Sequence, residues 1–487
     1  MLPPFDQSQI KMKALILLLF VSLSAQAEVW LPSIFADGMV LQADKPVMVW
    51  GEAEVGEEVS VEFAGQVKHA RADASKHWQV QLDAIPVSAD PRNLTVRSQR
   101  TGSTIQLAEV RVGEVWILAG QSNMGWPLAN CTGGNEAAAQ ADFPWLKIFK
   151  QWPFQGACDE PARDVTGGQW VTCDPQQAKQ LSGVGFFFAR ALQQSLPAGT
   201  PIALINTQMG GTYAECWIDR GTLENTPSSK PFLDKAAKEV QAGGSDPKGY
   251  WGENNFRRPS ALFNGKVAPI QPMAARGVIW YQGEGNTQRW LAAGYAGTLT
   301  ALINSWRAGF EQANLPFFIV QLPRYGAGAG NDWPSVRAAQ AQVAQALPAV
   351  ELAVTIDCGQ QDQIHPSDKE PVGERLALLA RANIYGETLV SSGPVYPQSM
   401  VRDGAMLIHF DASQGLQFKD GTGAGFEICG ADQLFVAAQA EILPHGIVRV
   451  FSPEVPQPVA ARYGWFNWGE VSLLNAAGLP AAPFSTQ

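Results

Sequence analysis

Residues 112–120 read VGEVWILAG, a mostly apolar run that ends in glycine, and QSNM follows directly at residues 121–124. Such a run is typical of a strand that is buried on both faces of a parallel sheet. Helical spacing of apolar residues appears at 184–192 and at 295–310. Three more apolar runs have the same character, at residues 202–206, 277–281 and 317–322. Apolar strands that alternate with helices predict an α/β fold with a parallel sheet.

Both flanks of this region have a different pattern. Residues 28–110 contain short runs in which apolar and polar side chains alternate, and proline or glycine separates them. Short alternating strands with close turn signals predict a β-sandwich. Alternation returns in residues 391–487, which predicts a second β region. With 487 residues the chain is too long for one core. We therefore expect an N-terminal β-sandwich at 28–110, an α/β domain at 111–390 and a C-terminal β region at 391–487.

The first residues predict export. Lys11 and Lys13 precede an apolar stretch at 14–21, and the small-residue site Ala25-Gln26-Ala27 follows. A basic start, a short apolar stretch and an A-x-A site are typical of a secretory signal peptide, here residues 1–27 with cleavage after Ala27. The stretch is too short to span a bilayer, and no later segment is long enough. We expect a mature protein of the periplasm or the extracellular space, outside the membrane.

The charge and cysteine content of the chain argue against some classes of partner and metal site. The formal net charge is -10 and the pI is about 5.1, so the surface repels phosphate backbones and nucleic acid is not expected as a partner. Six cysteines permit disulfide bridges after export, and a pair among Cys131, Cys158 and Cys173 would lie in one loop-rich region. No CxxC spacing is present, which argues against a structural zinc site.

Two motifs follow predicted strands. One contains a candidate serine nucleophile, and the other contains candidate backbone hydrogen-bond donors. Ser122 lies in a tight turn after the run that ends at Gly120, where helix N-terminal amides favour a developing negative charge. Gly210 and Gly211 follow the strand at 202–206, and paired glycines let backbone amides approach a substrate closely. Taken alone, the first motif also fits a serine N-cap and the second an ordinary turn.

Two further motifs complete a candidate site. Gln282 follows the strand at 277–281 and is a candidate side-chain donor, with Glu284 and Asn286 as supporting residues of the same loop. His365 is the only histidine in the α/β region, and it is the natural general base near neutral pH. Asp362 precedes it by three residues, a spacing that lets a carboxylate orient the imidazole. Taken alone, the first of these motifs also fits a polar loop without a catalytic role, and His365 also fits a histidine that caps the following helix.

Together these motifs resemble the SGNH hydrolase superfamily, and within it the sialate O-acetylesterase family. The resemblance rests on four blocks in order: GQSNM at 120–124, INTQMGGTYAECW at 205–217, WYQGEGN at 280–286 and DQIHPSDKEPVGERLA at 362–377. LPSIF at 31–35 and GLPAAPF at 478–484 extend it over nearly the whole mature chain. Gly285 departs from the family, which more often has alanine or a small polar residue there.

The resemblance implies a three-layer SGNH hydrolase domain and a serine esterase that removes O-acetyl groups from carbohydrates. Ser122 would be the nucleophile, His365 the base and Asp362 its orienting carboxylate. The amide of Ser122, an amide of Gly210 or Gly211, and Gln282 would hold the oxyanion. No metal ion or organic cofactor is implied.

Two alternatives stay open at this stage. The same scaffold could deacetylate a plant cell-wall glycan such as xylan or xyloglucan instead of sialic acid, with residues 219–254 as a specificity loop. Sixteen tryptophans and two β regions also fit a carbohydrate-binding protein without catalysis, although Ser122, Asp362 and His365 argue against it.

Overall fold

The computed structural model describes residues 29–151, 158–241, 255–411, 415–419 and 421–487. The predicted signal peptide and its cleavage site lie outside these residues, as does part of the 219–254 segment. A seven-strand path forms the centre of the molecule, in the order β13-β12-β11-β7-β10-β8-β9. Neighbouring strands along the path are parallel except β9, which pairs antiparallel with β8. The bounds are β7 (Thr104–Gly120), β8 (Phe143–Lys150), β9 (Gln169–Cys173), β10 (Ile202–Asn206), β11 (Gly277–Tyr281), β12 (Phe317–Val320) and β13 (Val350–Ala353).

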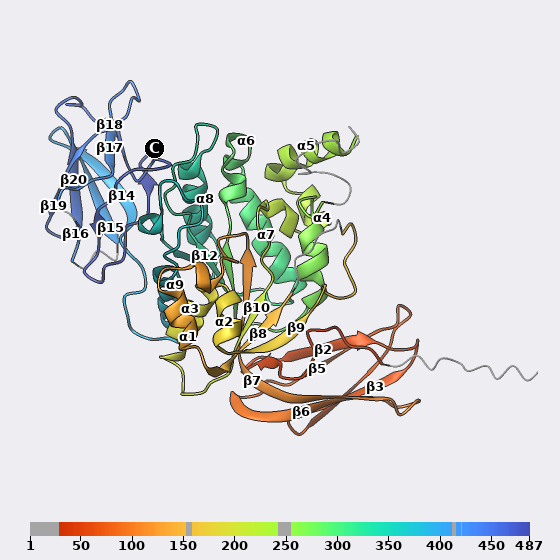
Figure 1. The fold of residues 1–487 in the computed structure, drawn as a ribbon. Coiled ribbons are helices and arrows are strands. Elements are labelled where there is room, and N and C mark those ends of the chain that lie inside the picture. The colour runs from red at the N-terminus through yellow and green to blue at the C-terminus, as the bar shows by residue number, and fades with distance from the viewer. Residues whose placement is uncertain (1–28, 152–157, 242–254, 412–414, 420) are drawn as a thin grey trace, which may run out of the picture.

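Helices cover both faces of this sheet. Trp116 of β7 packs against Phe188 of α3, whereas Trp280 of β11 packs against Trp306 of α7. Trp280 pairs in register with Ala119, and the two side chains point to the same face of the sheet. Side chains alternate along β7, so Ala119 and Trp116 point to opposite faces, and Trp280 therefore lies opposite Trp116. The layers are therefore helix, sheet and helix (Figure 1), which confirms the predicted fold class. The helices are α1 (Gly134–Ala139), α2 (Pro175–Gln180), α3 (Gly183–Gln193), α4 (Arg220–Glu224), α5 (Lys230–Gln241), α6 (Arg289–Ala292), α7 (Tyr295–Gly309), α8 (Trp333–Ala346) and α9 (Glu370–Asn383).

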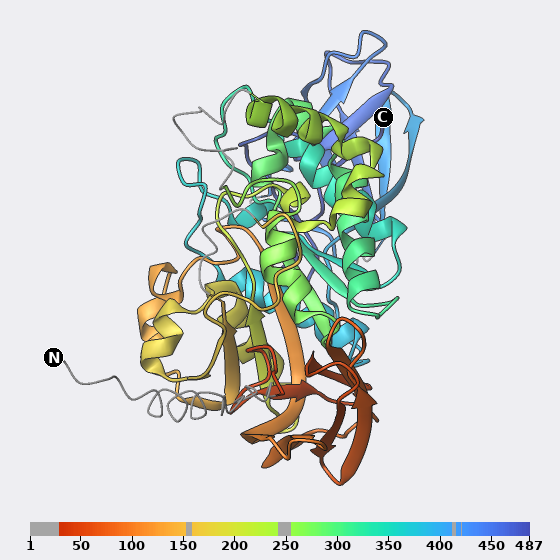
Figure 2. The same cartoon turned by 90° about the vertical axis from the view of Figure 1, so that its right-hand side faces the viewer.

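The N-terminal β region is joined to this core by a shared strand. The first part of β7 pairs with β6 and β1, and its last part pairs with β10 and β11. Figure 2 shows the strand running from the lower β region into the central sheet. The predicted boundary at 110–111 thus falls inside one strand, and the two regions share one hydrophobic core. The other strands are β1 (Val40–Gln42), β2 (Val47–Glu52), β3 (Glu58–Phe63), β4 (Gln66–Arg71), β5 (His77–Leu82) and β6 (Ser88–Ser98).

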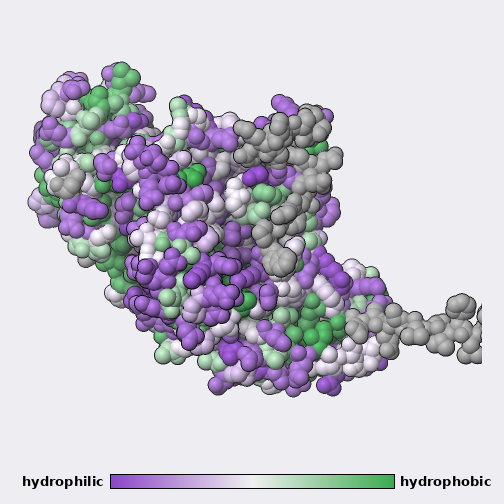
Figure 3. Space-filling model, in the orientation of Figure 1, coloured by the Kyte–Doolittle hydropathy of each residue, from purple (hydrophilic) through white to green (hydrophobic). Residues whose placement is uncertain are grey.

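The C-terminal β region has a hydrophobic core of its own, built around residues such as Ile408 and Val448. Its antiparallel sheets contain β14 (Val395–Arg402), β15 (Ala405–Asp411), β16 (Gln417–Phe418), β17 (Phe426–Cys429), β18 (Val436–Ala437), β19 (Gln439–Leu443), β20 (Ile447–Phe451), β21 (Ala460–Tyr463), β22 (Leu473–Leu474) and β23 (Phe484–Ser485). The face of the molecule in Figure 3 is mainly hydrophilic, with small scattered apolar areas. No helix of the described residues has the length and apolar character that a membrane span needs.

All six cysteines are free thiols in the structure, and five of them are buried. Burial raises the pKa of the Cys131 thiol to about 11 and that of Cys173 to about 12. The pairing among Cys131, Cys158 and Cys173 that the sequence allowed is therefore not formed here.

The end of β7 leaves no room for a side chain. Gly120 has a φ of +124°, and a Cβ at this position would lie 2.2 Å from the carbonyl oxygen of Tyr281 on the neighbouring strand. Only glycine fits here, because both the backbone angle and the neighbouring backbone exclude a Cβ.

We therefore predict that Gly120→Ala lowers the free energy of unfolding by more than about 2 kcal/mol, as measured by denaturant unfolding. Gly102→Ala is the matched control, since Gly102 also has a positive φ (+72°) but open space around it. It should cost only the backbone strain, about 1 kcal/mol. Equal losses in the two variants would contradict the steric explanation.

Candidate active site

A tight turn at the carboxyl end of β7 presents Ser122. The amide of Gln121 donates to the carbonyl of Tyr281 at 3.0 Å, and the amides of Met124 and Gly125 donate back to the carbonyl of Gln121. These bonds fold the chain sharply, so Ser122 lies half-buried at the edge of the sheet while its neighbours are more deeply placed.

Ser122 and His365 meet in the structure although 243 residues separate them. The Ser122 hydroxyl lies 2.7 Å from Nε2 of His365, within hydrogen-bond distance. His365 reaches this position from the loop between β13 and α9. This contact is the geometry of a serine nucleophile with its general base.

The protonation state of His365 suits a base. Burial lowers the pKa of His365, and the positive charge of Lys369 lowers it further. The imidazole is therefore mainly neutral at pH 7, with Nε2 able to accept the serine proton when the ring proton is on Nδ1.

A buried polar network joins the loops that carry these groups. Lys369 Nζ donates to Asn123 Oδ1 at 2.6 Å, and Asn123 Nδ2 donates to Glu284 Oε1 at 2.5 Å and to the carbonyl of Ile364 at 2.9 Å. Burial lowers the pKa of Lys369 to about 8 and raises the pKa of Glu284. The network holds the residue after Ser122, the third loop and the residue before His365 in fixed positions. The supporting role expected for Glu284 stays a prediction, and its contact with Asn123 is in line with it.

Two backbone amides are available next to the nucleophile. Gly210 lies against Ser122, since a Cβ added to Gly210 would be 3.4 Å from the Cβ of Ser122. Gly211 has a φ of +68°, and its carbonyl accepts a hydrogen bond from Arg257 Nε at 2.6 Å. In the described residues the amides of Ser122 and Gly210 donate to no protein acceptor. Among the described residues the amide of Gly211 has no acceptor either, so the contact with Ser122 is what makes Gly210 the better placed of the two predicted glycine donors.

Gln282 is held in another role than the one expected. Its Nε2 donates both hydrogens, to the carbonyl of Thr212 at 3.1 Å and to Asn286 Oδ1 at 2.8 Å, and its Oε1 accepts from Tyr295. Asn286 in turn donates to Glu215 at 2.9 Å. The side chain of Gln282 thus has no hydrogen left for an oxyanion, and together with Asn286 it supports the loop.

Asp362 is exposed, and no hydrogen bond joins its carboxylate to His365 in the part of the chain described. The predicted role of Asp362 as orienting group stays a prediction. The ring that does contact His365 is Trp126, which stacks on the imidazole with ring centroids 4.6 Å apart and an interplanar angle of 16°. No role for Trp126 follows from the sequence, because its position two residues after Met124 does not show that its ring reaches His365.

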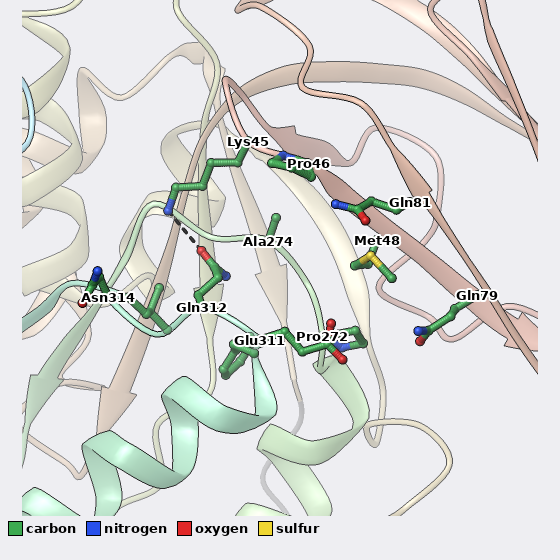
Figure 4. A pocket seen from close by; sticks show the side chains of 12 residues that line it. Lys45, Pro46, Met48, Gln79, Gln81, Pro272, Ala274, Glu311, Gln312 and Asn314 are labelled. Carbon is green, nitrogen blue, oxygen red and sulfur yellow. Dashed lines mark hydrogen bonds between the residues drawn. The ribbon is translucent and has the colours of Figure 1, made fainter.

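A groove of about 540 Å³ lies elsewhere on the molecule, between the β2–β5 sheet and the segment before β12 (Figure 4). Lys45 bridges it with hydrogen bonds to Gln312 Oε1 and to the carbonyl of Ala275. Its lining from the α/β region precedes β11 and β12, so it lies at the amino ends of these strands. Ser122 follows the carboxyl end of β7, at the opposite edge. Catalytic chemistry therefore belongs to the Ser122 edge.

Comparisons with known proteins show which family the chain belongs to. A family profile described as carbohydrate esterase, sialic acid-specific acetylesterase matches residues 112–381. The chain is 28% identical to the sialate O-acetylesterase of Mus musculus, with 97% of each chain covered, and 27% identical to that of Homo sapiens, with 96% and 94% covered. The crystal structure of a carbohydrate acetylesterase from Xanthomonas citri superposes with a TM-score of 0.83 at 37% identity, covering 94% of this chain and 99% of that one.

We predict that kcat/KM for 4-nitrophenyl acetate falls at a pH below 6.5, the ordinary value for histidine, since the pKa of His365 is lowered. Activity needs the neutral imidazole and is lost as the pH falls through this lowered pKa. Lys369→Gln removes one cause of the shift, so its acid limb should move upward. A wild-type limb at or above pH 6.5 would contradict this electrostatic account.

Proposed function

The chain belongs to the sialic acid-specific acetylesterase family of carbohydrate esterases and is a carbohydrate O-acetylesterase, and from this premise we propose that it works through an acetyl-enzyme formed on Ser122. The observation that carries the proposal is the 2.7 Å contact between the Ser122 hydroxyl and His365 Nε2. Neutral His365 and the unpaired amides beside Ser122 support it.

In the first step His365 Nε2 accepts the proton of Ser122 while Oγ attacks the acetyl carbonyl carbon. The carbonyl oxygen becomes an oxyanion, which accepts hydrogen bonds from the amides of Ser122 and Gly210. When the tetrahedral intermediate collapses, the bond to the sugar oxygen breaks. His365 returns its proton to that oxygen, so the sugar leaves as a neutral alcohol.

In the second step water replaces the sugar. His365 accepts a proton from the water as its oxygen attacks the acetyl carbon, and the same amides hold the second oxyanion. Collapse breaks the bond to Ser122 Oγ, which regains the proton from His365, and acetate is released. The protein groups return to their starting state, and the balance needs no other reactant than water.

The acetylated substrate is a sialic acid or a plant cell-wall glycan such as xylan or xyloglucan. The sialate O-acetylesterases support the first, and the more similar carbohydrate acetylesterase from Xanthomonas citri leaves the sugar open. We also propose export to the periplasm or the medium, supported by the sequence of residues 1–27.

The nucleophile is tested by acetate release from acetylated xylo-oligosaccharides and from O-acetyl sialic acid. The faster substrate assigns the sugar class, and Ser122→Ala should lower its turnover at least about 10³-fold. Ser75→Ala, an exposed serine of the β-sandwich, is the control and should leave turnover unchanged. Substantial acetate release by a correctly folded Ser122→Ala protein would refute the acetyl-enzyme.

The orientation of His365 gives a second test. We predict that Trp126→Ala lowers kcat about 10–100-fold, because a loosely held base is misplaced, and that Trp126→Phe keeps most of the activity. Asp362→Asn tests the predicted orienting role of Asp362, since a carboxylate that orients a triad histidine contributes about 10⁴-fold. A loss of that size in Asp362→Asn would show that Asp362 reaches His365 during turnover. Steady-state kinetics with pH profiles separate these outcomes.

A further inference from the structure

Trp290 is more exposed than any other aromatic residue that the structure describes. The chain has 16 tryptophans, and Trp290 exposes 38 % of its surface. It is the single aromatic among the well-exposed large apolar side chains of the described residues. Isolated exposed aliphatic residues need no explanation. A large indole left in water beside a reactive site is more informative, because tryptophan combines an apolar face with one polar N–H.

The indole of Trp290 has a fixed orientation. Its Nε1 donates to Gln288 Oε1 at 2.8 Å, and Gln288 Nε2 donates to the hydroxyl of Tyr213 at 3.3 Å. The next two residues, Leu291 and Ala292, are buried and anchor the short helix α6. The ring nitrogen thus donates to a protein acceptor, while 38 % of the residue surface stays in contact with solvent.

Both ends of this hydrogen-bond chain lead to the reactive serine. Tyr213 belongs to the loop in which Gly210 lies against Ser122. Helix α6 follows the third loop, where the amide of Gly285 donates to Gln121 Oε1 at 3.2 Å, one residue before Ser122. Figure 1 shows α6 on the side of the sheet toward which β7 points. Trp290 therefore lies at the edge of the sheet that carries the candidate active site.

We propose that Trp290 is a stacking platform for a sugar ring of the substrate, adjoining the sugar whose acetyl group reaches Ser122. The proposal rests on the proposed carbohydrate esterase activity at Ser122. A pyranose ring has a face of C–H groups and an edge of hydroxyls. The C–H face packs on the electron-rich indole, and the hydroxyl edge is left for polar side chains such as the exposed Arg289.

A platform of this kind discriminates by substrate size. A simple acetate ester ends at its leaving group and gains nothing from Trp290, whereas an oligosaccharide places a neighbouring ring on the indole. Binding energy from such a remote contact raises kcat/KM for the larger substrate. The ratio of kcat/KM on an acetylated oligosaccharide to kcat/KM on 4-nitrophenyl acetate therefore reports the platform, and it is insensitive to a general loss of active enzyme.

The kinetic test uses acetylated xylotetraose and 9-O-acetylated sialyllactose as oligosaccharide probes. In Trp290→Ala the ratio for the hydrolysed probe should fall about tenfold, and in Trp290→Phe less than about threefold. Leu434→Ala is the control, since Leu434 is a 69 % exposed apolar residue of the C-terminal β region. It should leave the ratio unchanged. An unchanged ratio in Trp290→Ala would overturn the proposal.

Binding gives a test that does not depend on turnover. Ser122→Ala should bind the preferred probe in calorimetry, and Ser122→Ala/Trp290→Ala should bind it about tenfold more weakly. Equal affinities, or no binding of either probe to Ser122→Ala, would overturn the platform. Full acetate release by Ser122→Ala would instead refute the proposed function, so the two failures are distinct. Matching thermal unfolding of the variants shows that each comparison is made on folded protein.

Discussion

The active site depends on the buried network of Lys369, Asn123 and Glu284. Each residue comes from a different catalytic loop, and each is almost fully buried. Asn123 follows Ser122 directly, and its amide holds the carbonyl of Ile364, the residue before His365. The network therefore sets the distance between Ser122 and His365.

Burying such charges is costly unless they are paired and hydrogen-bonded. The amide of Asn123 meets this condition by accepting from the ammonium of Lys369 and donating to the carboxylate of Glu284. Burial raises the pKa of Glu284 and lowers that of Lys369, so burial favours the neutral form of both residues. The charge of Lys369 opposes the shift of Glu284, and the charge of Glu284 opposes the shift of Lys369. Burial lowers the pKa of His365, and the charge of Lys369 lowers it further. The same set of contacts thus fixes the position of His365 and contributes to its neutral state.

The sequence predicted the α/β fold and the pair Ser122 and His365, because buried strands and strand-end loops leave local patterns. The predicted boundary at 110–111 lies where the sequence pattern changes, which is within β7, and the backbone pairing of that strand continues across it. The sequence could not assign Gln282. An amide side chain signals a donor, but whether its hydrogens face a substrate or Thr212 and Asn286 is decided by tertiary packing. Similarly, three-residue spacing allows Asp362 to face His365 but does not make the side chain turn inward.

The stacking of Trp126 on His365 bears on catalysis as well as on position. In the proposed mechanism His365 takes the serine proton and becomes an imidazolium, and the face of an indole attracts a cation. The interaction is stronger with the charged ring than with the neutral one, so it stabilises the state formed during attack more than the resting state. An orienting carboxylate acts in the same sense through charge. In this structure the parallel rings, 4.6 Å apart, are the only observed contact of that kind on His365 within the described residues. Since Trp126 lies four residues after Ser122, one short loop supplies both Ser122 and the ring on which His365 stacks.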